Sequence, residues 1–380
     1  MSEKAHHDTN FMMPQEPTRF EARHIDALLV HSHKIEASDI TIQTNQPIIA
    51  EIFGQLFKIT KRKLSNAEVS DILNAIYGPN GTTQIMRGED LDTHYEVRPT
   101  RTQRFRHRVN GTGCHVEGHA GIQITIRTIP STPPKLSSLA LPQNIINSIA
   151  PNEGVVYITG ATGSGKSTLL AAIIRELAED VNGNRKILTY EAPIEFVFDS
   201  IDMPSSIVSQ SEIPRNLSSF AAGVRNALRR KPHVILVGEA RDPETINAVL
   251  EAALTGHPVY TTLHTNGVAE TIRRLVGSFP QDERIGRTID IIETLRLIIW
   301  QRLVPSIDGR RVALREYLVF TEKLRDFLLD SDPEKVTATT RQLVEDYGQP
   351  MSVEVEKIYK DGIISERTYK ILIASVKRDY

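Results

Sequence analysis

Short stretches in which apolar and polar residues alternate dominate the first third of the chain. Such alternation marks half-buried β-strands, because successive side chains of a strand point to opposite faces of the sheet. It predicts strands at residues 39–44, 47–53, 55–59, 95–97, 104–109 and 123–129. Apolar residues at helical spacing predict helices over residues 19–34 and 65–77, and Ser65 and Glu68 are spaced as the capping box of the second helix. These elements indicate an α+β domain over residues 18–129.

The pattern changes after about residue 136, where short apolar runs begin to alternate with helical segments. The runs predict strands at residues 154–159, 186–190, 233–238 and 258–262. The run at 233–238 is almost wholly apolar, which is typical of a strand covered on both faces in a parallel sheet. Strands that alternate with helices predict a doubly wound α/β domain over residues 138–380. From residue 268 onward we expect mainly helices, with one further strand near residues 311–320.

Two other segments are set apart by their composition. Pro130-Ser131-Thr132-Pro133-Pro134 is typical of stiff, extended chain, so residues 130–137 are predicted to link the two domains. Residues 1–17 are polar with little apolar content, and we expect them to form a disordered tail. The 380 residues suffice for two or three domains of ordinary size.

The clearest chemical signal lies between the predicted strand at 154–159 and the helical pattern that follows it. It fits G-x-x-x-x-G-K-[ST], the P-loop, in the strand–loop–helix context that this motif needs; an ordinary glycine turn is the alternative. The predicted phosphate-binding set is Gly160, Ala161, Thr162, Gly163, Ser164, Gly165, Lys166, Ser167 and Thr168. Glycines let backbone N–H groups curl around a triphosphate, and the helix N-terminus adds partial positive charge. We expect Lys166 to reach the β- and γ-phosphates and Ser167 to hold Mg²⁺, so the cofactor is Mg²⁺ with ATP.

Acidic side chains follow two of the predicted strands. Glu239 comes after the apolar strand at 233–238, in the Walker B position, and is a candidate second ligand of Mg²⁺. Glu191 and Glu195 follow the strand that ends at Tyr190, and carboxylates there can orient water or take its proton. The alternative for each is a solvated loop residue. His264 follows the strand at 258–262, where it is either a satisfied core histidine or a contact to the γ-phosphate.

Bulk properties narrow the range of partners and compartments. The formal net charge is −2, so no global field attracts nucleic acid or acidic lipid, and we expect no direct nucleic-acid binding. Cys114 is the only cysteine, which rules out a disulfide within the chain and fits a reducing compartment. No apolar run approaches the roughly 18 residues that a transmembrane helix needs. We therefore expect a cytoplasmic protein that is recruited to any membrane at which it acts.

Four sequence blocks, in order along the chain, carry a resemblance to a known family. Residues 160–168 read Gly-Ala-Thr-Gly-Ser-Gly-Lys-Ser-Thr, 190–197 read Tyr-Glu-Ala-Pro-Ile-Glu-Phe-Val, 237–245 read Val-Gly-Glu-Ala-Arg-Asp-Pro-Glu-Thr, and 255–265 read Thr-Gly-His-Pro-Val-Tyr-Thr-Thr-Leu-His-Thr. They resemble the Walker A, Asp box, Walker B and His box of the PilT-like type II/IV secretion ATPases. The remaining sequence is similar to the DotB-like branch, found in Dot/Icm type IVB secretion systems and IncI-type conjugative plasmids.

The resemblance implies an architecture and a function. It implies a homohexamer of chains with an N-terminal PAS-like domain and a C-terminal RecA-like P-loop domain, which hydrolyses ATP to power secretion or conjugation and docks on inner-membrane components of the apparatus. In that family the residue matching Glu195 activates water, and the residue matching Glu239 is the Walker B acid. Arginines matching Arg108 and Arg127 reach the nucleotide. Ala192 departs from the pattern, because PilT-like chains carry Asp there.

Other functions remain open at this point. A pilus retraction or assembly motor would use the same four blocks. A nucleic-acid translocase shares the RecA-like core, although the near-neutral charge disfavours it. A small-molecule kinase would need an acceptor pocket and a lid, for which the sequence offers no candidate. A nucleotide-gated scaffold without useful turnover would be consistent with Ala192 but not with Glu195 and Glu239.

Overall fold

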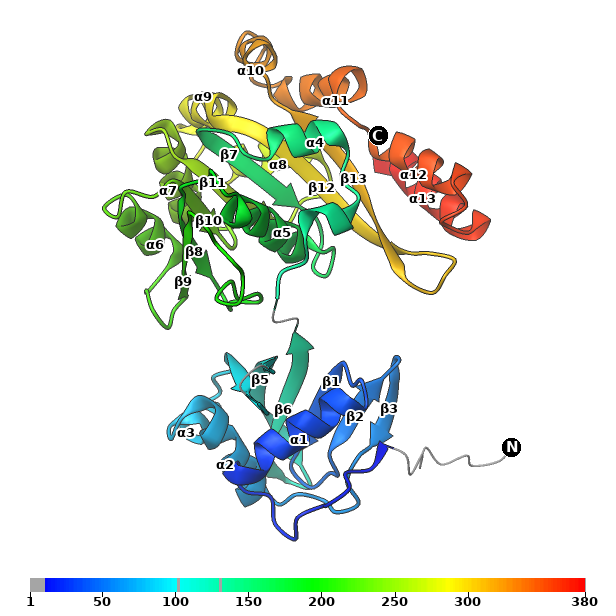
Figure 1. The fold of residues 1–380 in the computed structure, drawn as a ribbon. Helices are drawn as coiled ribbons and strands as arrows, with labels where there is room; N and C mark the ends of the chain where they lie inside the picture. Colours follow the sequence, from blue (N-terminus) through cyan, green and yellow to red (C-terminus); the bar gives the residue numbers. More distant parts are fainter. Residues whose placement is uncertain (1–10, 101–102, 130–131, 380) are drawn as a thin grey trace. The chain divides into compact units, whose positions relative to one another are not determined.

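The computed structural model describes residues 11–100, 103–129 and 132–379, and these divide into two compact units. The first unit contains the residues up to 131 together with Pro193–Phe196, and the second contains the rest of the chain. Residues 1–10 of the predicted tail and residues 130–131 of the predicted linker lie outside the described part. Each unit contains one β-sheet, helices that pack on it and a hydrophobic core of its own (Figure 1).

The first unit is built on an antiparallel sheet of six strands in the order β3-β2-β1-β6-β5-β4. The strands are β1 (Asp39–Gln43), β2 (Ile49–Ile52), β3 (Gln55–Lys58), β4 (Leu91–Val97), β5 (Phe105–Val116) and β6 (His119–Ile129). Its helices are η2 (Ala22–His24), α1 (Ile25–Lys34), α2 (Asn66–Tyr77) and α3 (Gly81–Met86). Apolar side chains of α1 and α2 share one core with those of β1 and β6, so the predicted α+β class is confirmed.

Two local expectations for this unit have different outcomes. The capping box of α2 is confirmed: the Ser65 hydroxyl accepts a hydrogen bond from Glu68 N, and the Glu68 carboxylate accepts one from Ser65 N. The disorder expected for the tail is wrong for residues 11–17. Met13 N donates to the carbonyl of Ile59 at 2.8 Å, and Phe11 and Met13 pack against the core. These two apolar side chains outweigh the polar composition around them.

The second unit contains a sheet of seven strands in the order β13-β12-β7-β11-β10-β8-β9. The strands are β7 (Gly154–Thr159), β8 (Lys186–Glu191), β9 (Ile207–Glu212), β10 (Val234–Val237), β11 (Pro258–Leu263), β12 (Leu295–Pro305) and β13 (Arg311–Val319). All neighbouring strands are parallel except β12 and β13. The carboxyl ends of β7, β11, β10 and β8 therefore lie side by side, which is where ligands of such sheets bind.

Helices cover this sheet on both faces, as the doubly wound prediction requires (Figure 1). The helices of the unit are η3 (Leu136–Leu139), α4 (Gln143–Ser148), α5 (Lys166–Glu179), α6 (Phe220–Ala227), α7 (Pro243–Leu254), α8 (Val268–Gly277), α9 (Arg284–Thr294), α10 (Glu322–Leu329), α11 (Val336–Tyr347), α12 (Met351–Lys360) and α13 (Glu366–Asp379). Helices α6 to α9 share one large core with the sheet, and α12 packs on β12 and β13 through Met351 and Val355. The predicted α/β class is confirmed.

Two strands of this sheet are absent from the sequence prediction. Strand β12 begins at Leu295, directly after α9 ends at Thr294, so no turn residue separates the apolar run of the strand from the helix. A short apolar run cannot be assigned to strand or helix by periodicity alone. Strand β9 lies at the edge of the sheet and is mostly polar, so it lacks the apolar run that marked the central strands.

Candidate nucleotide-binding site

The P-loop connects β7 to α5, the context that the sequence predicted. Strand β7 is buried at every position and ends at Thr159, one residue before the loop. Gly165 has a φ of 84°, in the left-handed region, and caps α5 immediately before Lys166. The loop thus ends at the first turn of a 14-residue helix, whose free N–H groups and dipole favour an anion.

Polar groups inside the loop fit a phosphate ligand. The Nζ atom of Lys166 donates to the carbonyl oxygens of Gly160 and Ala161, each at 2.9 Å, although the side chain is almost fully buried. The hydroxyl of Ser164 is buried without a hydrogen-bond partner among the described residues. Ser167 is exposed at the start of α5, so its hydroxyl is free to meet a ligand. These groups lose little by turning toward a triphosphate, because the buried amine only exchanges one set of oxygens for another.

Hydrogen bonds join the carboxyl ends of the strands beside the P-loop. Gly238 N donates to Tyr190 O at 2.7 Å, which ties the end of β10 to that of β8. Ala240 N donates to Thr262 O at 3.1 Å, which ties the same loop to β11. Glu191, Glu239 and His264 lie at the ends of these three strands, so the structure brings three predicted site residues to one edge of the sheet.

Glu239 and His264 form a pair. The Nε2 atom of His264 lies 3.4 Å from Oε1 of Glu239, and the two side chains are 46% and 27% exposed. The reading of His264 as a core histidine is therefore wrong, because nearly half of its ring faces solvent. Glu191 is held differently: its Oε1 accepts hydrogen bonds from Thr189 Oγ1 at 2.6 Å and from Gln210 Nε2 at 3.0 Å. These bonds fix its carboxylate at the end of β8.

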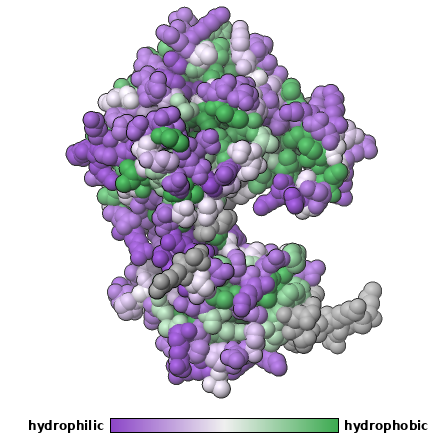
Figure 2. Space-filling view, in the orientation of Figure 1, coloured by the Kyte–Doolittle hydropathy of each residue, from purple (hydrophilic) through white to green (hydrophobic). Residues whose placement is uncertain are grey.

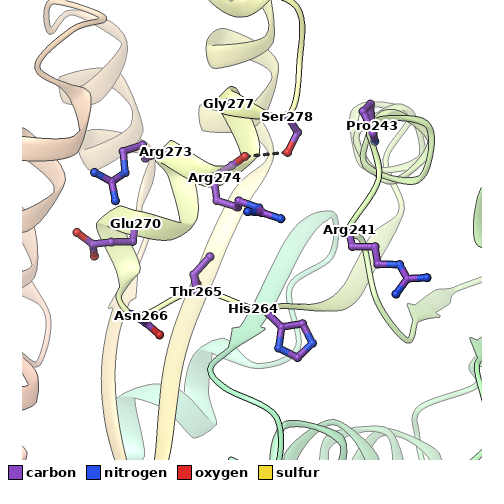
Figure 3. A pocket seen from close by; sticks show the side chains of 10 residues that line it. All are labelled: Arg241, Pro243, His264, Thr265, Asn266, Glu270, Arg273, Arg274, Gly277 and Ser278. Atoms are coloured by element: carbon purple, nitrogen blue, oxygen red, sulfur yellow. Dashed lines mark hydrogen bonds between the residues drawn. The ribbon is translucent and has the colours of Figure 1, made fainter.

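A pocket of about 620 Å³ opens beside His264, between the start of α7 and α8. In Figure 3, the guanidinium groups of Arg241 and Arg274 and the ring of His264 surround the open centre of the view, whereas Glu270 lies on the other side of α8. His264 lines this pocket and pairs with Glu239, so the pocket lies next to the strand ends described above. Its positive charges favour an anion at this end of the sheet.

The other predicted site residues lie in the first unit. Arg108 and Arg127 are cross-strand neighbours in β5 and β6. Arg108 pairs with Asp92, and this hydrogen bond raises the pKa of Arg108. Arg127 pairs with Asp39, with Nε 2.8 Å from the carboxylate oxygen. The carboxylate partners keep two guanidinium groups adjacent without strong mutual repulsion.

Glu195 belongs to the segment Pro193–Phe196, which clusters with the first unit. Within that unit the guanidinium group of Arg106 donates to the carbonyl oxygens of Ile194 at 2.8 Å and Glu195 at 2.9 Å. Arg106 is buried, so these bonds fix the backbone on which the Glu195 carboxylate stands. The only signal for Arg106 in the sequence is the alternation of Arg104, Arg106 and Arg108.

The sequence also missed a residue of the second unit that touches the P-loop. Gln301 of β12 donates from Nε2 to the carbonyl oxygen of Ser164 at 2.7 Å. No motif marks it, and β12 itself was not predicted. The only available signal was a polar residue at the end of the apolar run Leu297–Trp300.

The chain was compared with known proteins. The sequence model of the family described as "Type II/IV secretion system protein" matches residues 19–338. The type IV pilus retraction ATPase PilT of Pseudomonas aeruginosa is 35% identical over 307 residues, which are 80% of this chain and 85% of the relative. The solved structure of the Legionella pneumophila ATPase DotB is 65% identical with a TM-score of 0.90, and the match covers 96% of this chain and 99% of that one.

A second solved structure, the pilus retraction motor PilT with bound ADP, is 30% identical with a TM-score of 0.78 over 92% of this chain and 96% of that one. These likenesses agree with the fold described above. Together they support a RecA-like P-loop domain that carries ATPase activity. The chain belongs to the type II/IV secretion ATPase family, and among its relatives are DotB and PilT.

Proposed function

We propose that this chain is the Mg²⁺-ATPase motor of a type IVB secretion or conjugation apparatus, where it works as a homohexamer at the inner membrane. One observation carries the proposal: the likeness to DotB, at 65% identity over nearly the full length of both chains, exceeds the 30% identity to the PilT structure. Among the described residues, none of the helices combines the length and apolar character that crossing a bilayer requires. The face drawn in Figure 2 mixes hydrophilic side chains with small hydrophobic patches.

The P-loop and the strand ends beside it are suited to bind ATP with Mg²⁺. Lys166 would leave the carbonyl oxygens of its own loop for the β- and γ-phosphates. Mg²⁺ neutralises the phosphate charge, and Ser167 and Glu239 would hold it. In the part of the chain that the structure describes, no three His, Cys, Asp or Glu side chains form a metal cluster. Mg²⁺ does not need such a cluster, because it usually takes one or two protein ligands and completes its shell with phosphates and water.

Glu195, Glu191 and His264 would each have a different role in hydrolysis. Glu195 would orient the attacking water, with its backbone held by Arg106. His264 is partly exposed beside Glu239 and is suited to contact the γ-phosphate. Glu191, held by Thr189 and Gln210, would supply a carboxylate at the end of β8, although Ala192 lacks the carboxylate usual at its position. Arg108 and Arg127 would add positive charge from the first unit.

The residues proposed for phosphate binding and for hydrolysis are divided between the two units. Residues that bind phosphate lie in the second unit, whereas Glu195 and the arginines cluster with the first. Binding and loss of the γ-phosphate would change the conformation of the chain, and this change would convert hydrolysis into movement.

The test is deletion of the gene in its own bacterium. We expect loss of protein or plasmid-DNA transfer into recipient cells, with pilus retraction unchanged, and restoration by the wild-type gene but not by the Lys166→Ala variant. Loss of pilus retraction with transfer retained would instead support the pilus motor.

The hexameric assembly is tested separately. Mass photometry of the purified chain with Mg²⁺ and a non-hydrolysable ATP analogue should give the mass of a hexamer. A monomer at micromolar concentration would contradict this part of the proposal.

A further inference from the structure

Gln301 lies on β12, the strand that pairs with the P-loop strand β7. Its side chain is 3% exposed and bridges two groups. The amide Nε2 donates to Ser164 O in the P-loop at 2.7 Å, and Oε1 accepts from Nε of Arg315 on β13 at 2.9 Å. The P-loop backbone is thus joined by a buried hydrogen bond to β12 and, through the Gln301 side chain, to β13.

Arg315 fixes the orientation of this amide. The guanidinium group can only donate, so Gln301 must present its oxygen to Arg315 and its nitrogen to Ser164. Arg315 is itself buried, donates to Leu139 O at 3.1 Å, and has its pKa lowered to about 10 by burial. It remains charged near neutral pH, so the assignment of the amide holds over the physiological range.

Strand β12 also explains two of the P-loop glycines. A Cβ atom on Gly160 would lie 2.3 Å from the carbonyl oxygen of Gln301, and one on Gly165 would lie 2.9 Å from its Nε2. A Cβ on Gly163 would have no neighbour within 4 Å. The first and last glycines of the loop are therefore needed for close packing against Gln301, apart from any contact with phosphate.

The bond to Ser164 O has a consequence for phosphate binding. In a trans peptide the C=O and the following N–H point in opposite directions. Holding Ser164 O toward β12 therefore turns the N–H of Gly165 away from β12. The same bond keeps a carbonyl oxygen, which would repel phosphate, out of the loop interior.

We infer that Gln301 is a positioning residue for nucleotide binding, and that Arg315 acts through it. The Gln301 amide holds the Ser164–Gly165 peptide so that its N–H is ready for phosphate before the ligand arrives. This preorganisation lowers the cost of binding. The inference rests on nucleotide binding at the P-loop, and does not depend on the apparatus that the ATPase powers.

The test is Gln301→Glu in the full-length protein. The carboxylate keeps the shape of the side chain and still accepts from Arg315, but it cannot donate to Ser164 O. We expect the dissociation constant for a fluorescent ADP analogue, measured with Mg²⁺, to rise at least tenfold. The KM for ATP should rise similarly while kcat at saturating ATP changes little, because the contact is made before the chemical step. Gln143→Glu makes the same change at an exposed glutamine and should leave the dissociation constant unchanged.

Stability measurements separate positioning from simple folding. The melting temperature of Gln301→Glu should stay close to that of the wild type, since the variant gains a charge pair with Arg315. If it does not fold, Gln301→Met, which removes both hydrogen bonds without adding charge, should show the same rise in the dissociation constant. A folded variant that binds the analogue within twofold of the wild type would overturn the inference. Failure of the wild type itself to bind nucleotide would instead contradict the assignment of the P-loop.

Discussion

Nε2 of His264 lies 3.4 Å from Oε1 of Glu239, and the two side chains extend from the ends of adjacent parallel strands. The imidazole and the carboxylate can therefore respond to the same ligand. Hydrogen bonds from the Thr262 hydroxyl to Gly238 O at 2.6 Å and from Ala240 N to Thr262 O hold the two strand ends together. A change in one side chain should consequently affect the other without unfolding the site.

Replacing Glu239 by glutamine should separate binding from hydrolysis. The amide retains the size of the side chain but loses the charge that would face Mg²⁺ and the attacking water. We expect the rate of phosphate release to fall by about 100-fold or more, with nucleotide still bound. Phosphate release and equilibrium titration on the same sample measure both quantities. Glu244→Gln, an exposed acid on α7 paired with Arg225, is the control and should leave the rate unchanged. Full activity of Glu239→Gln would show that the Walker B assignment is wrong.

Lys166→Ala should weaken nucleotide binding. The buried ammonium group is the only charge within the loop, and a hydrogen bond to a charged group contributes about 1.5–3 kcal/mol. We expect the dissociation constant for ADP to rise at least tenfold. The fold should be retained, because the bonds of the amine to Gly160 O and Ala161 O lie within its own loop. Lys186→Ala, at the far end of β8, is the matched control. Unchanged affinity in Lys166→Ala would contradict the phosphate-binding role.

Local signals were enough to predict the parts of the site that follow one another in the chain. The strand, loop and helix around Lys166 are consecutive, and Glu239 directly follows an apolar strand. Burial of β10 on both faces leaves a clear apolar run in the sequence. The capping box at Ser65 is equally local, since its partners are three residues apart.

Contacts between distant segments could not be predicted in this way. Gln301 and Ser164 are 137 residues apart, and only the pairing of β12 with β7 brings them together. Arg106 meets Ile194 over 88 residues, again through tertiary structure. The role of Glu195 was predicted from its place after a strand and from resemblance, and the roles of Arg108 and Arg127 from resemblance. All three remain predictions that variants at these positions can test.

Glu68→Gln should destabilise the first unit. The Glu68 carboxylate is buried, yet hydrogen bonds from Arg62, Ser65 N and Phe20 N outweigh the cost of burial and lower its pKa to about 2. The contribution of these hydrogen bonds to the free energy of unfolding is fully present above pH 4.5, the ordinary pKa of the carboxyl group. It is lost as the pH falls toward 2. At pH 7 we expect a loss of about 1–3 kcal/mol. Hydrogen exchange of α2 in the full chain measures it, with the exposed Glu89→Gln as control. Protection equal to the wild type would contradict the prediction.

His107 should make the first unit sensitive to mild acid. Its ring is fully buried on β5, and burial lowers its pKa to about 4, so the folded state resists protonation that the unfolded chain accepts near pH 6.5. The stability is present above pH 6.5 and is lost as the pH falls toward 4. At pH 4.5 the loss should reach about 2 kcal/mol. Hydrogen exchange of β5, corrected for intrinsic rates, should show this loss in the wild type and in the exposed-site variant His115→Leu. His107→Leu should lack this component, and an identical pH dependence in His107→Leu would refute the assignment.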